Sequence, residues 1–366
     1  MTPKVAIVHD YLNQAGGAER VVGTLHGMFP EAPIFTSILD RSTLWPSLRD
    51  ADIRTSFMQH LPGVGRHFKK YLPLFPRAIE SFDLSEFELV ISSSSAFGKG
   101  AIVAPHAFHV CYCHTPMRFA WDYDRYVERE AFGRLQRAIL PRVIASLRRW
   151  DLATASRPNV YVVNSSTVAD RVKRCYGRES EIIPPPVDIS QYTLSSVDAE
   201  YYLVVSRLNP YKRIDLVVDA FNKTGKPICI IGDGPDRPSL ESRAQSNIQF
   251  LGRLPDADVA AYYARCRAVI FPGEEDFGIV PLEANASGRP VVAFKRGGAL
   301  DTVIGGQTGV FFEQQTVEGL NDGIARAESA SWDKLRLRRH AEAFGESVFR
   351  KRLMELLNRT VSGLRV

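Results

Sequence analysis

The sequence has none of the long apolar runs that would place it across a membrane. No stretch approaches the ~18 residues that a transmembrane helix needs. An apolar strand pattern occupies the start of the chain, with no basic segment and long apolar run before it, so we expect no signal peptide. Cysteine is scarce as well, because only five occur, at scattered positions. An odd, scattered set favours reduced thiols in a cytoplasm over a disulfide framework, so we expect a cytoplasmic protein.

A large excess of one charge is also missing. The 46 Lys and Arg residues face 41 Asp and Glu residues, which leaves a net charge of +5. A balance this small does not indicate a nucleic-acid partner, and we find no zinc-finger, homeodomain or single-strand-binding motif. Residues 1–190 hold 23 basic against 19 acidic residues (+4), and residues 191–366 hold 23 against 22 (+1). The first half is therefore the better candidate for contact with an anionic surface.

The chain does contain two runs of alternating strand and helix patterns. Its 366 residues, 45% of them hydrophobic, suffice for two domains with a core each. Three consecutive prolines at 184–186 predict a linker between them. We predict an α/β protein with Rossmann-like, doubly wound domains at 1–186 and 187–344. A cleft between two such domains is the usual place for a small ligand.

A loop rich in carboxylates lies in the second of these domains. Residues 274–284 read EEDFGIVPLEA, between an apolar strand and a helix that Pro281 is predicted to open. The preceding Phe277, Gly278, Ile279 and Val280 include no Ser, Thr, Asp or Asn cap, so the first amides of the helix should be unpaired. Such a helix start favours an anion, and Gly278 lets a phosphate approach the backbone closely.

Glu275 and Glu283 flank this predicted phosphate site. A ligand with phosphates in the middle and sugars at both ends would satisfy both carboxylates, because each can accept hydrogen bonds from neighbouring hydroxyls. A nucleotide sugar has this shape. For the loop taken alone, a solvated acidic surface with Glu283 offsetting the helix dipole is the alternative.

Basic and glycine-rich loops follow two other strands of the second domain. Arg207 and Lys212 come after the strand YYLVV, and Gly232 and Gly234 come after the strand PICII. Ligands bind outside the carboxyl ends of the strands in open α/β sheets, and two cations there suit a diphosphate. An ordinary surface charge pair is the alternative for the two cations.

Taken together, these motifs resemble those of glycosyltransferase family 4, retaining enzymes of the GT-B fold, along essentially the whole chain. Glu275 and Glu283 match the family's two glutamates, which are separated by seven residues, and Phe277 and Gly278 match its Phe-Gly. The resemblance implies that Glu275 contacts the transferred sugar and Glu283 the ribose. It also implies that Arg207 and Lys212 bind the donor phosphates, and that a C-terminal helix at about 345–366 returns to the first domain.

The resemblance extends to the first domain. Gly16 and Gly17 match the family's N-terminal glycine loop, which approaches the donor phosphate. His114, within CYCHTPMRFAWD, matches the histidine that faces the transferred sugar. This segment and FDLSEFELVISSSSAFGKG resemble a subgroup that includes mannosyltransferases of surface-polysaccharide assembly. The resemblance further implies donor contacts from Arg253 and Leu254.

The implied activity is retaining, metal-independent transfer of a sugar, with no cofactor besides the nucleotide-sugar substrate. GDP-mannose is the favoured donor, and a polyprenyl-diphosphate-linked or other lipid-linked glycan is the favoured acceptor. The implied catalytic residues are His114, Glu275, Arg207 and Lys212. The alternatives are transfer from a UDP-sugar or another GDP-sugar, a nucleotide-sugar epimerase of the same fold, and a non-catalytic nucleotide-sugar sensor.

Two short motifs could indicate a metal, and we interpret both otherwise. Cys111 and Cys113 would share one face of a strand while His114 points to the other, so we expect core thiols. Asp122 and Asp124 match an Asp-x-Asp motif, but no strand pattern leads into them, and we expect a surface or acceptor-side role. His9 and Asp10, at the end of the first strand, could touch a ligand.

Two basic stretches in the first domain could lie on a membrane. Residues 131–150 hold five Arg and no acid, and residues 66–76 read RHFKKYLPLFP. A basic amphipathic segment can bind an anionic bilayer, so we expect peripheral contact with the inner face of the cytoplasmic membrane. Core helices with solvated basic faces are the alternative.

Overall fold

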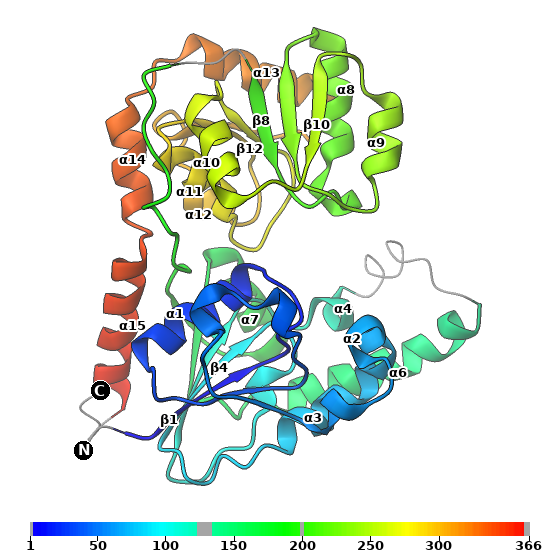
Figure 1. Ribbon diagram of the computed structural model, residues 1–366, viewed down its shortest axis with the longest axis vertical. Coiled ribbons are helices and arrows are strands. Elements are labelled where there is room, and N and C mark those ends of the chain that lie inside the picture. Colours follow the sequence, from blue (N-terminus) through cyan, green and yellow to red (C-terminus); the bar gives the residue numbers. More distant parts are fainter. Residues whose placement is uncertain (1–2, 123–133, 198–200, 362–366) are drawn as a thin grey trace. The chain divides into compact units, whose positions relative to one another are not determined.

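The computed structural model describes residues 3–122, 134–197 and 201–361 (Figure 1). The chain forms two compact units, Met1–Pro186 with Phe349–Val366, and Val187–Val348. Each unit is built on one parallel sheet with helices on its faces, which confirms the predicted α/β class with two Rossmann-like domains. Within the described residues, none of the helices is both long enough and apolar enough to cross a bilayer.

The first unit contains a seven-stranded sheet of order β3-β2-β1-β4-β5-β6-β7. Every neighbouring pair is parallel, as the crossover helices require. Its strands are β1 (Val5–His9), β2 (Ile34–Thr36), β3 (Ile53–Thr55), β4 (Leu89–Ser94), β5 (Phe108–Cys113), β6 (Val160–Val163) and β7 (Glu181–Ile182). Its helices include α1 (Gly17–Met28), α2 (Val64–His67), α3 (Phe75–Glu80), α4 (Arg118–Trp121), α6 (Arg134–Ala153), α7 (Ser166–Tyr176) and α15 (Glu346–Thr360).

Apolar side chains cover both faces of this sheet, which is why its central strands read as continuous apolar runs. Ile7 of β1 belongs to a core cluster with α1, while Ala6 and Val8 belong to a second cluster with α3 and α6. Successive residues of a strand point to opposite faces, so β1 contributes to both clusters. Burial on both faces fixes where the strand ends lie, and the candidate site of this unit is built at those ends.

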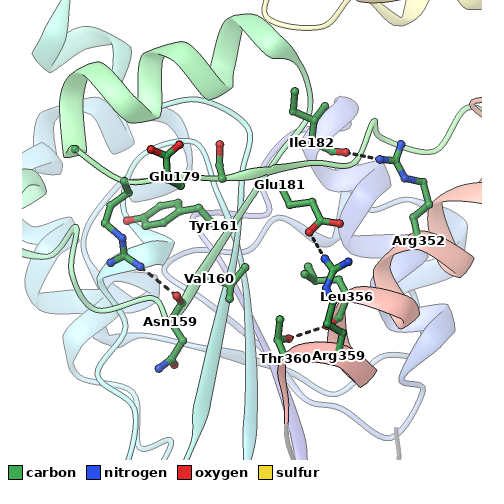
Figure 2. A pocket seen from close by; sticks show the side chains of 13 residues that line it. Asn159, Val160, Tyr161, Glu179, Glu181, Ile182, Arg352, Leu356, Arg359 and Thr360 are labelled. Atoms are coloured by element: carbon green, nitrogen blue, oxygen red, sulfur yellow. Dashed lines mark hydrogen bonds and ion pairs between the residues drawn. The ribbon is translucent and has the colours of Figure 1, made fainter.

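The C-terminal helix α15 packs against this first sheet (Figure 1). Phe349 lies edge-on to Tyr112 of β5, with ring centroids 5.7 Å apart. Figure 2 shows the recess beside the helix, where Arg352 donates to the Ile182 carbonyl at 2.7 Å and Arg359 pairs with Glu181. These contacts hold α15 along the β6–β7 edge. The C-terminal region forms two separate helices. The first, α14 (Lys334–Glu342), belongs to the second unit, whereas most of α15 belongs to the first.

The second unit contains a six-stranded parallel sheet of order β10-β9-β8-β11-β12-β13. Its strands are β8 (Tyr202–Val205), β9 (Ile228–Ile231), β10 (Ile248–Gly252), β11 (Val269–Phe271), β12 (Val291–Phe294) and β13 (Gly309–Phe312). Its other helices are α8 (Ile214–Thr224), α9 (Arg237–Arg243), α10 (Asp256–Arg265), α11 (Ile279–Ala286), α12 (Ala299–Thr302) and α13 (Val317–Ser329). Two core clusters again cover the two faces. The strand order places the loops after β10, β9, β8 and β11 next to one another.

One predicted boundary is wrong in a way that affects the site. Helix α11 begins at Ile279, two residues before Pro281, so the proline occupies the third helical position. Proline is tolerated there because the amides of the first turn have no partner within the helix. Glu283 is therefore the fifth residue of α11 and lies beyond its first turn.

Candidate functional site

Two glycine turns press against the loop that follows β8. Gly232 has φ of 129°, and a Cβ there would lie 1.8 Å from the Ser206 carbonyl oxygen. A Cβ on Gly234 would lie 2.3 Å from the Leu208 carbonyl oxygen. Only glycine permits this approach, so both residues serve to seat residues 206–208 at the sheet edge. The loop holds Arg207 in place.

Arg207 and Arg253 are exposed cations at this edge, following β8 and β10. Neither side chain has a hydrogen-bond or ion-pair partner among the residues that the structure describes. A guanidinium presents a planar fork of donors that suits phosphate oxygens. The two arginines can therefore accept an anionic ligand without first breaking an internal contact.

Lys212 and Glu275, predicted as separate ligand contacts, form an ion pair. Lys212 Nζ lies 2.5 Å from Glu275 Oε1, and the side chains are 13% and 23% exposed. Lys212 belongs to the short helix Pro210–Lys212 after β8, and Glu275 belongs to the loop after β11. The structure thus brings the two residues together across neighbouring strand ends. Any ligand phosphate that binds Lys212 must share it with, or take it from, this carboxylate.

A second glycine pair, which sequence reasoning missed, holds the Glu275 loop. The Gly298 amide donates to the Glu275 carbonyl at 2.8 Å. A Cβ on Gly297 would lie 2.4 Å from that carbonyl oxygen, and one on Gly298 would lie 2.1 Å from the Phe277 carbonyl oxygen. The only signal in the sequence was the Gly-Gly pair after β12. These contacts fix the backbone that carries the carboxylate.

The N-terminus of α11 has the uncapped geometry that the sequence predicts. Gly278 is its N-cap, with φ of 85° and no side-chain hydrogen bond. A left-handed φ favours glycine, and a Cβ here would also lie 2.9 Å from the Phe271 ring. Because Pro281 has no N–H, the amides of this helix start that lack a partner within the helix are those of Gly278, Ile279 and Val280. Helix starts of this kind suit a phosphate.

Glu283 lies further along the same helix and is held by a buried tyrosine. The Tyr263 hydroxyl donates to Glu283 Oε2 at 2.8 Å, and the Tyr263 ring packs edge-on to Tyr192 at 5.6 Å. Burial and the neighbouring Glu283 charge raise the pKa of Tyr263 well above its usual value, so its hydroxyl stays protonated and can donate. Tyr263 was missed because nothing in the segment AAYYARC distinguishes it from a core tyrosine. Leu254, the remaining predicted donor contact, is half-buried after β10.

In the first unit, His114 follows directly after β5 and is 9% exposed. Its Nε2 lies 2.8 Å from Ser93 Oγ near the end of β4. The backbone carbonyl of His114 accepts a hydrogen bond from the side-chain Nδ2 of Asn164 at 3.0 Å. Gly16 and Gly17 mark the start of α1, and Gly16 is an N-cap without a side-chain hydrogen bond. Both predicted features therefore lie at the carboxyl ends of parallel strands, where ligands of such sheets bind.

The structure assigns Asp10 to the framework of this edge. Its carboxylate is 2% exposed and accepts the backbone amides of Ser95, Ala96, Phe97 and Gly98 at 2.6–2.9 Å. A carboxylate with four such bonds has no capacity left for a ligand, so the expectation that Asp10 could touch one is wrong. Its role is to hold the turn after β4.

The two motifs set aside as metal sites have different outcomes. Cys111 and Cys113 are buried free thiols within β5, as expected. Asp122 follows α4, but Asp124 lies outside the described residues, so its role stays a prediction. Across the part of the chain that the structure describes, His, Cys, Asp and Glu side chains form no group of three that could hold a metal ion.

Comparisons with known proteins agree with this architecture. Over 182 residues the chain is 28% identical to O-antigen chain mannosyltransferase C of Escherichia coli, covering 47% of this chain and 48% of that protein, so the chain spans about half the length of this curated relative. Over 371 residues it is 24% identical to alpha-1,3/1,6-mannosyltransferase alg2 of Schizosaccharomyces pombe, covering 84% of this chain and 70% of the relative. The crystal structure of HepE from Anabaena in complex with UDP superposes with a TM-score of 0.73 at 18% identity, over 97% of this chain and 100% of that one.

Two family descriptions match consecutive parts of the chain. Glycosyltransferase Family 4 matches residues 15–191, which include the glycine loop and His114. Glycosyl transferases group 1 matches residues 188–346, which include the cationic loop and both glutamates. Since the two matches together run through both parallel-sheet units, the chain belongs to the family 4 glycosyltransferases of the GT-B fold.

Proposed function

We propose that this protein is a retaining glycosyltransferase that moves mannose from GDP-mannose to a lipid-linked glycan. The observation that carries the proposal is the set of groups at one edge of the second sheet. Arg207 is unpartnered among the described residues, Lys212 is paired with Glu275, and the uncapped start of α11 follows the same loop. Cations, helix amides and a carboxylate at neighbouring strand ends suit a diphosphate that is bonded to a sugar.

Each group has a role in the proposed reaction. The bond between the anomeric carbon and the diphosphate breaks, and a new bond forms between that carbon and an acceptor hydroxyl. The acceptor proton passes to an oxygen of the leaving phosphate, so the protein supplies no general base. Arg207, Lys212 and the α11 amides stabilise the charge that develops on the diphosphate. This role for protein cations is why we propose that the reaction needs no metal.

The carboxylates and His114 would position the sugars of the donor. Glu283, oriented by Tyr263, would accept hydrogen bonds from the ribose hydroxyls. Glu275 would contact the transferred sugar while its ion pair with Lys212 keeps it near the diphosphate. His114 would also contact the transferred sugar, as the family resemblance implies. Gly16 and Gly17 would let a ligand approach the backbone at the start of α1.

The donor sugar rests on the relatives rather than on the geometry. Mannosyltransferases are among the relatives, whereas the solved HepE structure contains UDP. A UDP-sugar is therefore the second candidate donor. A thermal-shift panel of GDP-mannose, other GDP-sugars and UDP-sugars tests the choice, because a ligand at 100 times its Kd adds about 2.7 kcal/mol of stability. A shift with UDP-sugars alone would replace GDP-mannose in the proposal.

Peripheral membrane contact belongs to the same proposal. Segment 53–79 contains no acidic residue, and its exposed side chains include Lys70 and Phe57, the latter 42% exposed. Arg142 and Arg149 of α6 are exposed too, while buried apolar side chains of both segments, such as Val64 and Ile144, belong to one core cluster. A basic surface over an apolar core suits anionic headgroups. Sedimentation with vesicles of anionic lipid, and not with neutral vesicles, is the expected result.

A further inference from the structure

A line of four buried polar side chains runs from the start of α1 to His114. Glu19 Oε1 lies 3.6 Å from His9 Nε2, and His9 Nδ1 lies 3.1 Å from Ser93 Oγ. Ser93 Oγ in turn lies 2.8 Å from His114 Nε2. Glu19 and His9 are 2% exposed, Ser93 is fully buried and His114 is 9% exposed. Water therefore has little access to these contacts, and each polar atom depends on its protein neighbour.

The fold brings these residues together through adjacent strands. β1, β4 and β5 are neighbours in the sheet, and His9 is paired in register with Ser93. His114 comes directly after β5, and Glu19 lies in the first turn of α1, just after the glycine loop. The residues are far apart in the sequence, so no local motif indicates the line. Its position links the glycine loop to His114 within one unit.

The neighbours of each atom determine the direction of the hydrogen bonds. His9 Nδ1 also lies 2.9 Å from the Ser93 carbonyl oxygen, which can only accept, so Nδ1 carries a proton. Ser93 Oγ can accept from the same N–H. Its own proton then has one acceptor within reach among the described residues, His114 Nε2. A serine that donates to Nε2 leaves the neutral imidazole with its proton on Nδ1.

Glu19 explains why His9 can hold this arrangement. Burial lowers the pKa of His9, but the contact with Glu19 and its negative charge outweigh it, and the pKa is raised. Burial raises the pKa of Glu19, but His9 outweighs it, and that pKa is lowered. Gln14 also donates to Glu19 Oε1 at 3.0 Å. Both shifts favour the charged forms of the pair, so Glu19 compensates a charge on His9, although Nε2 of His9, 3.6 Å from Glu19 Oε1, makes no hydrogen bond to any described residue.

We propose that Glu19, His9 and Ser93 are positioning residues that hold His114 as a neutral imidazole with its proton on Nδ1. The inference rests on the proposed function, in which His114 contacts the transferred sugar. In this state the ring carries no charge, and its proton is on Nδ1, the nitrogen that does not contact Ser93. Fixing the ring through its other nitrogen is a common way to orient a functional imidazole.

The sheet provides a matched control one residue away. Ser92 also lies in β4 and is fully buried, and its Oγ lies 2.8 Å from Nε2 of buried His109. This pair has the same chemistry but points to the opposite face of the strand. Burial, and then the charges of Lys99 and Arg157, lower the pKa of His109 to about 3, so it is a neutral core histidine. Ser92→Ala therefore removes the same hydroxyl from the same strand without touching His114.

Nitrogen-15 NMR of the histidine side chains tests the proposal directly. The His114 signals are identified by their loss in His114→Gln. In the wild-type protein we expect a protonated Nδ1 and an unprotonated, hydrogen-bonded Nε2. Ser93→Ala should remove this pattern, through tautomer exchange or a shift of the Nε2 signal, whereas Ser92→Ala should leave it unchanged. A wild-type His114 protonated on Nε2 would overturn the proposal even without any variant.

Kinetics provide the second measurement. Ser93→Ala and Glu19→Gln should lower kcat by up to about 10²-fold with little change in donor KM, because a misplaced group mainly affects the reaction step. Ser93→Thr, which keeps the hydroxyl, should restore part of the rate, and Ser92→Ala should keep the wild-type kcat. Equal losses in Ser92→Ala and Ser93→Ala would show a merely structural role. If no nucleotide sugar is turned over, the proposed function fails while the NMR result still decides the tautomer.

Discussion

Removing a carboxylate that binds a ligand usually weakens the binding of that ligand. Because Glu275 is paired with Lys212, we predict that its removal does not weaken the binding of nucleoside diphosphate. In Glu275→Gln, Lys212 loses the negative charge that lies 2.5 Å from its ammonium group and keeps only a neutral amide oxygen there. The diphosphate then competes for the ammonium with a weaker acceptor. Nucleoside diphosphate should bind with unchanged or higher affinity, whereas sugar transfer should slow, because the sugar has lost its carboxylate contact.

The size of the effect follows from the burial of the pair. The side chains are 13% and 23% exposed, so the pair is partly buried. An exposed salt bridge contributes about 0–1 kcal/mol, and removing one partner of a fully buried pair costs about 3–5 kcal/mol. The interaction free energy of this pair should lie between these values. Releasing Lys212 should therefore favour the diphosphate by at most about 1–2 kcal/mol. Since about 1.4 kcal/mol corresponds to a tenfold change, the Kd for GDP should be between unchanged and roughly 30-fold lower.

Glu283→Gln is the matched comparison, because it changes a carboxylate of the same unit in the same way. Glu283 is proposed to bind the ribose, which GDP and the donor share. Its loss should weaken GDP binding by about 1.5–3 kcal/mol, the typical contribution of a hydrogen bond to a charged group. Isothermal titration calorimetry with GDP and UDP on the wild type and both variants, beside transfer rates, measures the difference. If Glu275→Gln lost nucleotide affinity and Glu283→Gln kept it, the ribose would lie at Glu275 and the transferred sugar at Glu283, and the reasoning would be refuted.

Four further predictions concern the cations, the metal, the tyrosine and the core. Arg207→Ala should lower kcat about 10²–10³-fold at saturating donor, and an unchanged kcat would exclude a role on the leaving group. Transfer should persist in EDTA, and a loss that Mn²⁺ or Mg²⁺ restores would show that a metal is needed. Tyr263→Phe should raise the Kd for GDP about tenfold by calorimetry, through the lost hydrogen bond to the ribose-binding carboxylate, whereas Tyr201→Phe, whose hydroxyl bonds a backbone carbonyl, should not. Lys99→Met breaks a fully buried ion pair and should cost about 3–5 kcal/mol of unfolding free energy in urea, against less than ~1 kcal/mol for the exposed Lys223→Met.

Most of the fold could be predicted because its central strands are apolar on both faces. β1 and β5 of the first sheet and β8, β9 and β11 of the second were each expected as strands from the sequence. The edge strands β3 and β7 were missed, since IRT and EI are short and charged. Helix α13 was also missed, and α11 was placed two residues late because Pro281 is more common at the first helical position.

The candidate site was predictable where one loop carries the chemistry. Arg207, Glu275 and Gly278 each follow a recognisable strand, and parallel strands end at the same edge. The residues from other segments that hydrogen-bond to these side chains could not be predicted, because tertiary packing determines which residues meet. The hydrogen bond of Tyr263 to Glu283 and the contact of Ser93 with His114 join residues with no shared local pattern. Such supporting residues emerge only when the strands are placed side by side.

The central claim is that a sugar leaves a nucleoside diphosphate for an acceptor hydroxyl. The most direct test measures GDP release from GDP-mannose with and without a polyprenyl-diphosphate-linked glycan, beside mass spectrometry of the acceptor. We expect release that depends on the acceptor, one added hexose for each GDP released, and a rate that is about 10²–10³-fold lower in Arg207→Ala. Conversion of the donor to another nucleotide sugar with no acceptor and no GDP release would indicate an epimerase and contradict the account.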